Sequence, residues 1–113
     1  MRLATLILPT TGNDGTDHTD THAALRLILI DAFGGFTVTA GDGGWRDDSG
    51  RVYLDPVAVY SVAMSETGEN ETRLESIARL YGHLAGQQCV LVAHASGAVA
   101  FVDSSVNVME SVA

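Results

Sequence analysis

The densest group of residues able to ligate a metal or move a proton lies near the start of the chain, between Asp14 and His22. Within it, His18 and His22 are four residues apart, so an early helix would place both imidazoles on one face. Such oxygen and nitrogen donors suit a divalent cation, but their spacing matches no metal-site signature. The same residue types are typical of a solvated helix start. We favour that interpretation and assign neither a metal nor a cofactor.

A second group, Trp45, Arg46, Asp47 and Asp48, places an indole and a guanidinium beside two carboxylates. This combination suits stacking and anion recognition. We favour the alternative, a structural role in which Trp45 covers the hairpin and Arg46 pairs with Asp48 or Asp55. Catalysis requires a nucleophile or base that a third group holds in place. Candidates elsewhere in the chain are His83, His94, Tyr60 and Ser96. No spacing ties them together, so no catalytic residue is assigned.

A simple series of elements must position these groups. Apolar runs and period-two alternation predict five strands, and 3.6-residue periodicity predicts two helices, over 21–33 and about 71–85. The expected strands are 3–8, 36–46, 51–64, 88–94 and 98–102. The order β-α-β-β-α-β plus a final short strand predicts an α+β, ferredoxin-like fold, with an antiparallel sheet and two helices on one face.

Several finer features follow from the same pattern. The shift of parity at Asp55 and Pro56 predicts a bulge or break in the long hairpin. The first helix is apolar nearly all round, so it should be buried or contribute to an oligomer contact. His94, beside a turn, should be an exposed strand-end residue, and Cys89 should pack as a small apolar side chain. The residues expected on the open face of the sheet include Thr37, Thr39, Tyr53 and Tyr60.

The length of 113 residues indicates a single domain. We assign residues 1–103 to that domain and residues 104–113 to a C-terminal tail that is loose or pairs with another chain. A chain this small buries a limited share of its surface, so we also expect a homo-oligomer.

The charge balance restricts the partners. The formal net charge is −8 and every basic residue is an arginine, which disfavours direct binding to nucleic acid. Acidity fits solubility, a basic or nucleic-acid-binding protein partner, or mimicry of nucleic-acid charge. A single cysteine favours a reducing compartment, and no signal peptide or membrane span is visible. We therefore expect a cytoplasmic protein that does not bind membranes.

The central block resembles a family of small bacterial, phage and plasmid domains of unknown function. The resemblance covers roughly residues 34–93, from Gly-Phe-Thr-Val through Gly-x-Gly-x-Trp-Arg-Asp-x-x-Gly-x-Val and a later Pro to Gly-Gln-x-x-Val. It implies a ferredoxin-like fold and carries no chemistry to transfer. The matching residues are Gly35, Phe36, Thr37, Val38, Gly44, Trp45, Arg46, Asp47, Gly50, Val52, Pro56, Gly86, Gln87 and Val90.

These observations lead to two competing functions. The first is a small acidic, non-catalytic binding protein that acts by protein–protein contact. One form of it is a phage or mobile-element inhibitor of a host defence complex (anti-CRISPR-like). The alternative is a dimeric ferredoxin-like protein or enzyme with a small-molecule pocket on the sheet, lined by Tyr53, Tyr60, Trp45 and His94. Enzyme activity is left unassigned, with the balance against it. The surface expected to contact a ligand or partner comprises Trp45, Arg46, Asp47, Asp48, Tyr53, Asp55, Tyr60, Glu66, Glu69 and Glu71.

Overall fold

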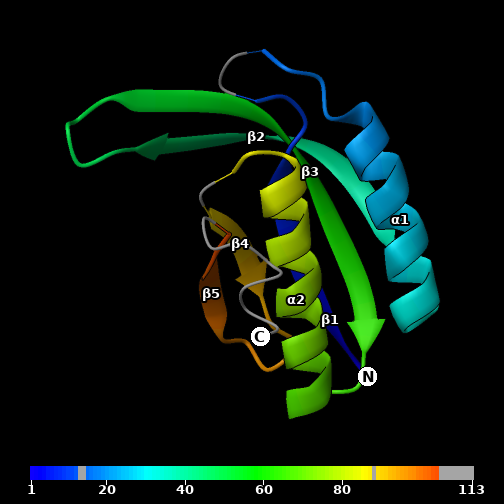
Figure 1. Cartoon of the computed structure of the whole chain (residues 1–113). Helices are drawn as coiled ribbons and strands as arrows, with labels where there is room; N and C mark the ends of the chain where they lie inside the picture. The colour runs from blue at the N-terminus through cyan, green and yellow to red at the C-terminus, as the bar shows by residue number, and fades with distance from the viewer. Residues whose placement is uncertain (13–14, 88, 105–113) are drawn as a thin grey trace, which may run out of the picture.

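The computed structural model describes residues 1–12, 15–87 and 89–104. Its five strands form one antiparallel sheet in the order β2-β3-β1-β4-β5, and two helices cover one face of that sheet (Figure 1). The elements are β1 (Arg2–Pro9), α1 (Thr19–Phe33), β2 (Thr37–Arg46), β3 (Val52–Met64), α2 (Gly68–Leu84), β4 (Cys89–Ala93) and β5 (Val99–Asp103). The ferredoxin-like α+β fold expected from the sequence is therefore confirmed.

The core lies between the sheet and the helices. Alternate residues of the strands point toward the helices, because side chains of a strand alternate between its two faces. In β1 these are Ala4, Leu6 and Leu8, each at most 1% exposed. Leu25 and Leu29 of α1 and Leu74 and Ala78 of α2 pack against them. Burial of this one apolar layer is the main stabilising contribution to a domain of this size.

Helix α1 begins beside an acidic side chain. Asp17 Oδ1 accepts hydrogen bonds from the backbone N–H and the hydroxyl of Thr19, at 2.9 and 2.6 Å. The helix ends at Gly34, whose φ of 90° is the left-handed conformation that glycine adopts most easily. The helix is not largely buried, because Leu27 is 70% exposed and Ile30 is 47% exposed. The other expectation for it, an oligomer contact, stays a prediction.

Helix α2 begins three residues earlier than its periodicity predicts. The Thr67 hydroxyl accepts a hydrogen bond from Asn70 N at 3.1 Å, so Thr67 caps the helix and Gly68 opens it. Glu69 and Glu71 lie in the first turn and His83 in the last, which suits the helix dipole at both ends.

The long hairpin extends well beyond the rest of the sheet. Strand β3 pairs with β1 only from Val57 to Met64, whereas it pairs with β2 from Val52 to Ser61. We call residues 41–56 the arm, because this part of the hairpin projects from the body as a two-stranded ribbon (Figure 1). The predicted bulge at Asp55 and Pro56 is wrong: the pairing runs without interruption through Asp42–Pro56 and Gly43–Asp55.

Two smaller expectations also change. Cys89 is exposed at the start of β4, instead of packed in the core. The proposed tail of residues 104–113 lies outside the described residues, except for Ser104, which is buried and donates a hydrogen bond to Gln87 O at 2.5 Å. Among the described residues, neither helix combines the length and the apolar character that crossing a membrane requires.

Candidate functional site

A hollow of about 350 Å³ lies at the root of the arm. Both strands of the ribbon contribute to it, and its lining consists of Asp42, Gly43, Gly44, Leu54, Asp55 and Pro56. Glycine backbone therefore lines the hollow, with Asp42 and Asp55 among the lining residues and no basic side chain. Asp42 is paired with Pro56 and Asp55 with Gly43, so the two aspartate side chains point to opposite faces of the ribbon. Backbone that carries no Cβ allows close approach of another molecule. Carboxylates recognise cations and hydroxyl or amine donors.

The root of the arm is joined to the body through Thr10. Its backbone N–H and its hydroxyl both donate to Pro56 O, at 3.1 and 3.3 Å. Thr10 follows Pro9, the last residue of β1, and Thr10 O accepts from His18 N at 3.2 Å. Pro56, in the wall of the hollow, is thus connected through Thr10 to Pro9, whose carbonyl belongs to a group of buried polar residues.

We call this group the buried network: His22, Tyr60, Tyr81 and the carbonyl of Pro9, with Arg26 at its edge. His22 Nδ1 lies 2.7 Å from the Tyr60 hydroxyl, and His22 Nε2 lies 2.9 Å from Pro9 O. The Tyr81 hydroxyl donates to Pro9 O at 2.6 Å and lies 3.0 Å from His22 Nε2. The three aromatic side chains come from α1, β3 and α2, so the network joins both helices to the sheet.

The acceptors and donors decide which tautomer of His22 fits. A carbonyl oxygen only accepts, so Nε2 carries the hydrogen that faces Pro9 O. Nδ1 then accepts from the Tyr60 hydroxyl, and that oxygen accepts in turn from Arg26 Nε at 3.3 Å. Each polar atom of the neutral imidazole has a hydrogen-bond partner, so its burial leaves no polar atom unsatisfied.

Burial also shifts the acid–base properties of the network. Loss of solvent lowers the pKa of His22, and the nearby charges of Arg26 and His18 lower it further. The hydrogen bond to Pro9 O and the carboxylate of Asp17 oppose this shift. Burial raises the pKa of Tyr81 far above its ordinary value, with a further contribution from Tyr60. Burial therefore favours the uncharged forms of both His22 and Tyr81.

Two other histidines are buried. His18 is 6% exposed and its Nε2 has no hydrogen-bond partner. His94 is also 6% exposed, so its expected exposure is wrong. His94 directly follows the last residue of β4, and its Nε2 is 2.8 Å from a carboxylate oxygen of Glu75 on α2. It therefore does not join Trp45 and Tyr53 in one pocket.

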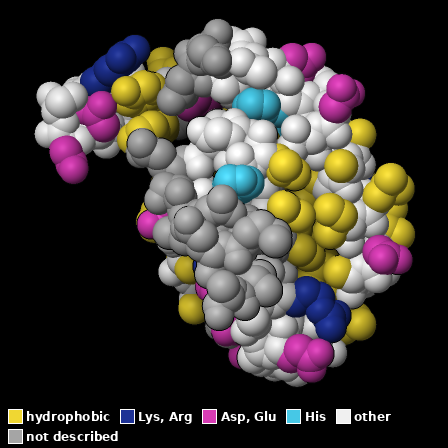
Figure 2. Space-filling view, in the orientation of Figure 1, with side chains coloured by type: hydrophobic (Ala, Val, Ile, Leu, Met, Phe, Trp, Pro, Cys, Tyr) yellow, Lys and Arg dark blue, Asp and Glu magenta, His cyan; other side chains and the backbone are white. Residues whose placement is uncertain are grey.

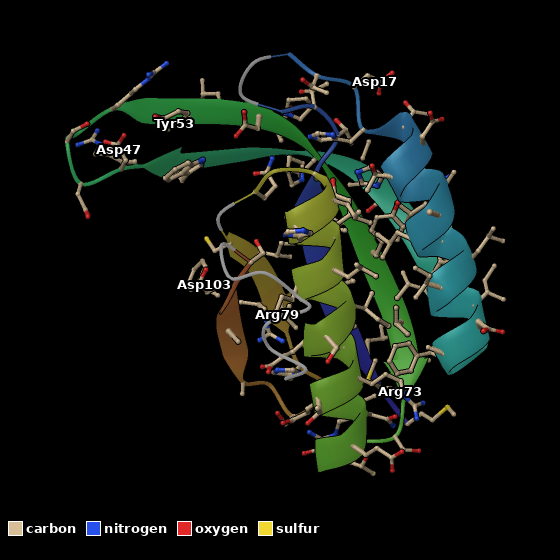
Figure 3. The ribbon with its side chains drawn as sticks, in the orientation of Figure 1. Asp17, Asp47, Tyr53, Arg73, Arg79 and Asp103 are labelled. Carbon is tan, nitrogen blue, oxygen red and sulfur yellow. The ribbon has the colours of Figure 1, made fainter. Side chains whose placement is uncertain are left out.

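The tip of the arm is organised by one aspartate. Asp47 Oδ1 accepts from Ser49 N, Ser49 Oγ and Arg51 N, and these hydrogen bonds lower the Asp47 pKa. Behind the tip, Trp45 stacks on Tyr53 with ring centroids 4.5 Å apart, and Arg51 lies 4.9 Å from the Tyr53 ring (Figure 3). Trp45 remains 52% exposed.

The residues predicted to form one working surface are not all brought together. Trp45, Arg46, Asp47, Asp48, Tyr53 and Asp55 all lie on the arm, and Asp55 lines the hollow. Tyr60 is fully buried beneath the helices, so its predicted place on the open face is wrong. The cause is parity, because Tyr60 and Tyr53 are an odd number of residues apart and point to opposite faces.

The three glutamates of that predicted surface lie around the start of α2: Glu66 precedes the helix, and Glu69 and Glu71 are in its first turn. Glu66 pairs with Arg2 at 3.2 Å, Glu69 pairs with Arg73 at 3.2 Å, and Glu71 lies in the first turn. As for a metal, no three ligating side chains gather within residues 1–12, 15–87 and 89–104. Asp14, one of the ligands considered from the sequence, lies outside these residues.

The sequence did not reveal the hollow or the buried network. No function was expected for Asp42 or its neighbouring glycines, and His22 was interpreted as part of a polar helix start. One signal was available: His22 follows Thr19 by three residues and precedes Leu25 and Leu29, so it shares their buried face of α1.

Comparison with known proteins gives a family and a fold. The chain belongs to the family described as a protein of unknown function, DUF3574, which matches residues 18–101. None of the curated proteins compared with this chain matches it. Two solved structures are similar: a phage SAM lyase in complex with S-methyl-5′-thioadenosine (TM-score 0.70, 14% identity) and a phage SAM lyase in its apo state (TM-score 0.71, 12% identity). Each likeness covers 93% of this chain, and respectively 91% and 90% of the other chain.

These likenesses correct the function expected first from the sequence. A non-catalytic protein that blocks a partner through its acidic surface is contradicted, because the similar structures are of a lyase that acts on a small molecule. The likeness itself establishes the shared fold, at identities too low to carry residues across.

Proposed function

We propose that this chain binds a small molecule, and that the ligand occupies the hollow at the root of the arm. The observation that carries the proposal is the lining of the hollow, in which Asp42 and Asp55 stand beside glycine backbone without any basic side chain. Its volume of about 350 Å³ falls within the range of roughly 300–1,000 Å³ that small-molecule sites occupy.

The lining selects a class of ligand. An acidic lining without a basic side chain favours a compound that carries a positive charge or hydroxyl donors, and it disfavours a phosphate. Glycines at 43 and 44 let such a compound lie against the backbone. Adenosyl sulfur compounds meet this description, since S-adenosylmethionine (SAM) has ribose hydroxyls and a net positive charge, from its sulfonium and ammonium groups against one carboxylate. They are also the first class to test because one similar structure holds S-methyl-5′-thioadenosine.

The buried network supports the site by fixing its wall. Pro9 O holds both His22 and Tyr81, and the adjoining Thr10 holds Pro56. A wall fastened in this way is rigid before the ligand arrives, and a preorganised site loses less entropy on binding. We also assign the protein to the cytoplasm, on the basis of its single cysteine.

Isothermal titration calorimetry tests the proposal with SAM and with S-methyl-5′-thioadenosine, which lacks the sulfonium charge. We expect both compounds to bind the wild-type chain. Asp42→Asn and Asp55→Asn should each weaken SAM by about tenfold or more, because a hydrogen bond to a charged group contributes roughly 1.5–3 kcal/mol. The loss for the uncharged compound should be smaller. Chromatography of the same mixtures reports any conversion of the ligand.

Asp48→Asn is the matched control, since Asp48 lies on the same arm but outside the lining of the hollow. Its affinity for SAM should equal that of the wild type. Absence of heat for both compounds at millimolar concentration would reject this ligand class. An equal loss in Asp48→Asn and Asp55→Asn would show that the general acidity of the arm, and not the hollow, attracts the ligand.

A further inference from the structure

The face of the sheet turned away from the helices has no cover within the described chain. In Figure 1 both helices lie on the same side of the sheet, so neither helix of the described chain covers the other side. Strand residues that alternate with the buried ones point to this side, which we call the open face. Its largest apolar side chains are Leu3, Ile7, Val59, Leu91, Val99 and Phe101. Phe101 is 73% exposed and Leu3 is 64% exposed.

The open face is also almost free of charge. In the body of the sheet, Asp103 at the end of β5 is the one charged side chain that the described strands direct to this side. This is unusual for a chain with a formal net charge of −8. The other acidic residues of the described chain lie on the helices, on the loops and on the arm.

We propose that a second copy of this chain covers the open face, with the two sheets packed face to face. Two copies that each carry a charge of −8 repel one another wherever acidic residues meet. On the open face they meet through uncharged, apolar side chains, so this surface is complementary to itself, as a two-fold interface requires. A basic partner would instead be drawn to the acidic helices and arm.

The arm extends the same surface. Trp45 and Tyr53 are paired across the ribbon and, by the register of the strands, lie on the same side as Val57 and Val59. Their stacked rings therefore continue the apolar open face along the arm, where Asp55 is the one charged side chain that the register places on this side. Aromatic side chains of this kind are enriched at the centres of protein interfaces.

A rival apolar surface exists on the helix side. Ile28, Ile77, Leu80 and Leu84 line a narrow slot between α1 and α2, and Figure 2 shows apolar side chains gathered over this region. Charged side chains border it in the same view, which makes it a poorer surface for two acidic chains to share. The slot has a volume of about 20 Å³, too small to receive a side chain of a partner.

Sedimentation velocity of the full chain over a series of concentrations tests the proposal. We expect the wild type to be a dimer or a higher oligomer. Phe101→Lys should raise the dissociation constant by at least tenfold, because it places a charge in an apolar interface. Leu84→Lys is the matched control, since Leu84 is similarly exposed, at 60%, but lies on the rival surface. It should leave the assembly unchanged.

The native thiol supplies a second readout. Cys89 is the single cysteine, is exposed and lies at the rim of the open face, so a spin label can be attached without a substitution. Double electron–electron resonance should detect a coupling between two labels in the wild type and in Leu84→Lys, and none in Phe101→Lys. Circular dichroism confirms that each variant is folded.

Three results would overturn the proposal. A wild-type chain that stays monomeric at millimolar concentration excludes a second copy on the open face. Dissociation by Leu84→Lys with an intact Phe101→Lys assembly assigns the interface to the helix slot. An oligomer that survives both substitutions assigns it elsewhere on the chain. Ligand binding enters none of these readouts, so they stand independently of the proposed function.

Discussion

At the scale of the residue, His22 shows how packing changes the chemistry of a side chain. In the sequence it is one polar residue among several at a helix start. In the structure α1 docks on the sheet and carries His22 beneath Tyr60 and Tyr81, where burial lowers its pKa. Its resistance to protonation is therefore set by tertiary contacts that no local pattern encodes. The sequence could predict that a helix starts among these polar residues, but not that one of its histidines is buried.

The lowered pKa of His22 predicts a pH dependence of stability. The folded state disfavours the protonated imidazole, so the unfolded state binds more protons below the unfolded pKa of about 6.5. The stabilisation is complete above that value and is lost as the pH falls from it toward the folded pKa. Urea unfolding from about pH 5 to 8 should show a slope of up to 1.36 kcal/mol per pH unit. His22→Gln should abolish it.

Other titrating groups define the controls. Asp17, Arg26 and His18 act on His22, and Tyr60 and Tyr81 touch it. The lowered pKa values of Asp17 and Asp47 act in a different window, because their contribution is present above the usual value of 3.8 and is lost below it. His83→Gln, which alters an exposed histidine, should retain the slope. An unchanged slope in His22→Gln would assign the effect to another buried histidine.

At the scale of the element, the arm marks the limit of what the sequence could predict. The alternation in residues 36–46 and 51–64 correctly predicted a long hairpin, with its turn at Asp47 to Gly50. It could not show that β1 pairs with only part of β3, because the length of a partner strand is not a local property. The hollow lies where that partner ends. Its position therefore depended on information from the other end of the chain.

The arm should be held in shape mainly by Asp47. A two-stranded ribbon is at best marginally stable in water, and three donors converge on one oxygen of this side chain. Asp47→Ala should weaken the near-ultraviolet circular dichroism of Trp45, the single tryptophan, and speed amide hydrogen exchange along the arm. The global unfolding midpoint should change little, because the arm contributes no residue to the core.

The neighbouring residue provides the comparison. Asp48 is exposed in the same turn, so Asp48→Ala should leave both the tryptophan signal and the exchange rates as they are. Equal effects of the two substitutions would mean that the arm is held by something other than the Asp47 hydrogen bonds.

At the scale of the whole molecule, the order of elements was predictable and the site was not. Helical and strand periodicities, with turn residues between them, define β-α-β-β-α-β and hence the sheet order. The fold nevertheless supports many functions. Net charge was a poor guide to function, because it sums all charges and does not say where on the surface they lie. Its distribution, with acidic helices and arm beside an uncharged open face, carries the information about contacts.

The buried network also has a consequence for how the chain unfolds. It joins residues far apart in the sequence, with 72 positions between Tyr81 and Pro9 and 59 between Tyr81 and His22. Such contacts form only after both helices have docked, so they should be absent from the folding transition state. Interactions of this kind act as a kinetic lock, because they slow unfolding without speeding folding.

Tyr81→Phe tests this lock in stopped-flow experiments. Loss of one hydrogen bond of about 1 kcal/mol should accelerate unfolding roughly fivefold and leave the folding rate nearly unchanged. Tyr53→Phe removes a hydroxyl from the arm, at 3.3 Å from Asp47, and should alter neither rate. A slower folding rate in Tyr81→Phe would instead place the network in the folding nucleus. With the lock in place, the lifetime of the native state is governed by the same four groups that fix the wall of the hollow.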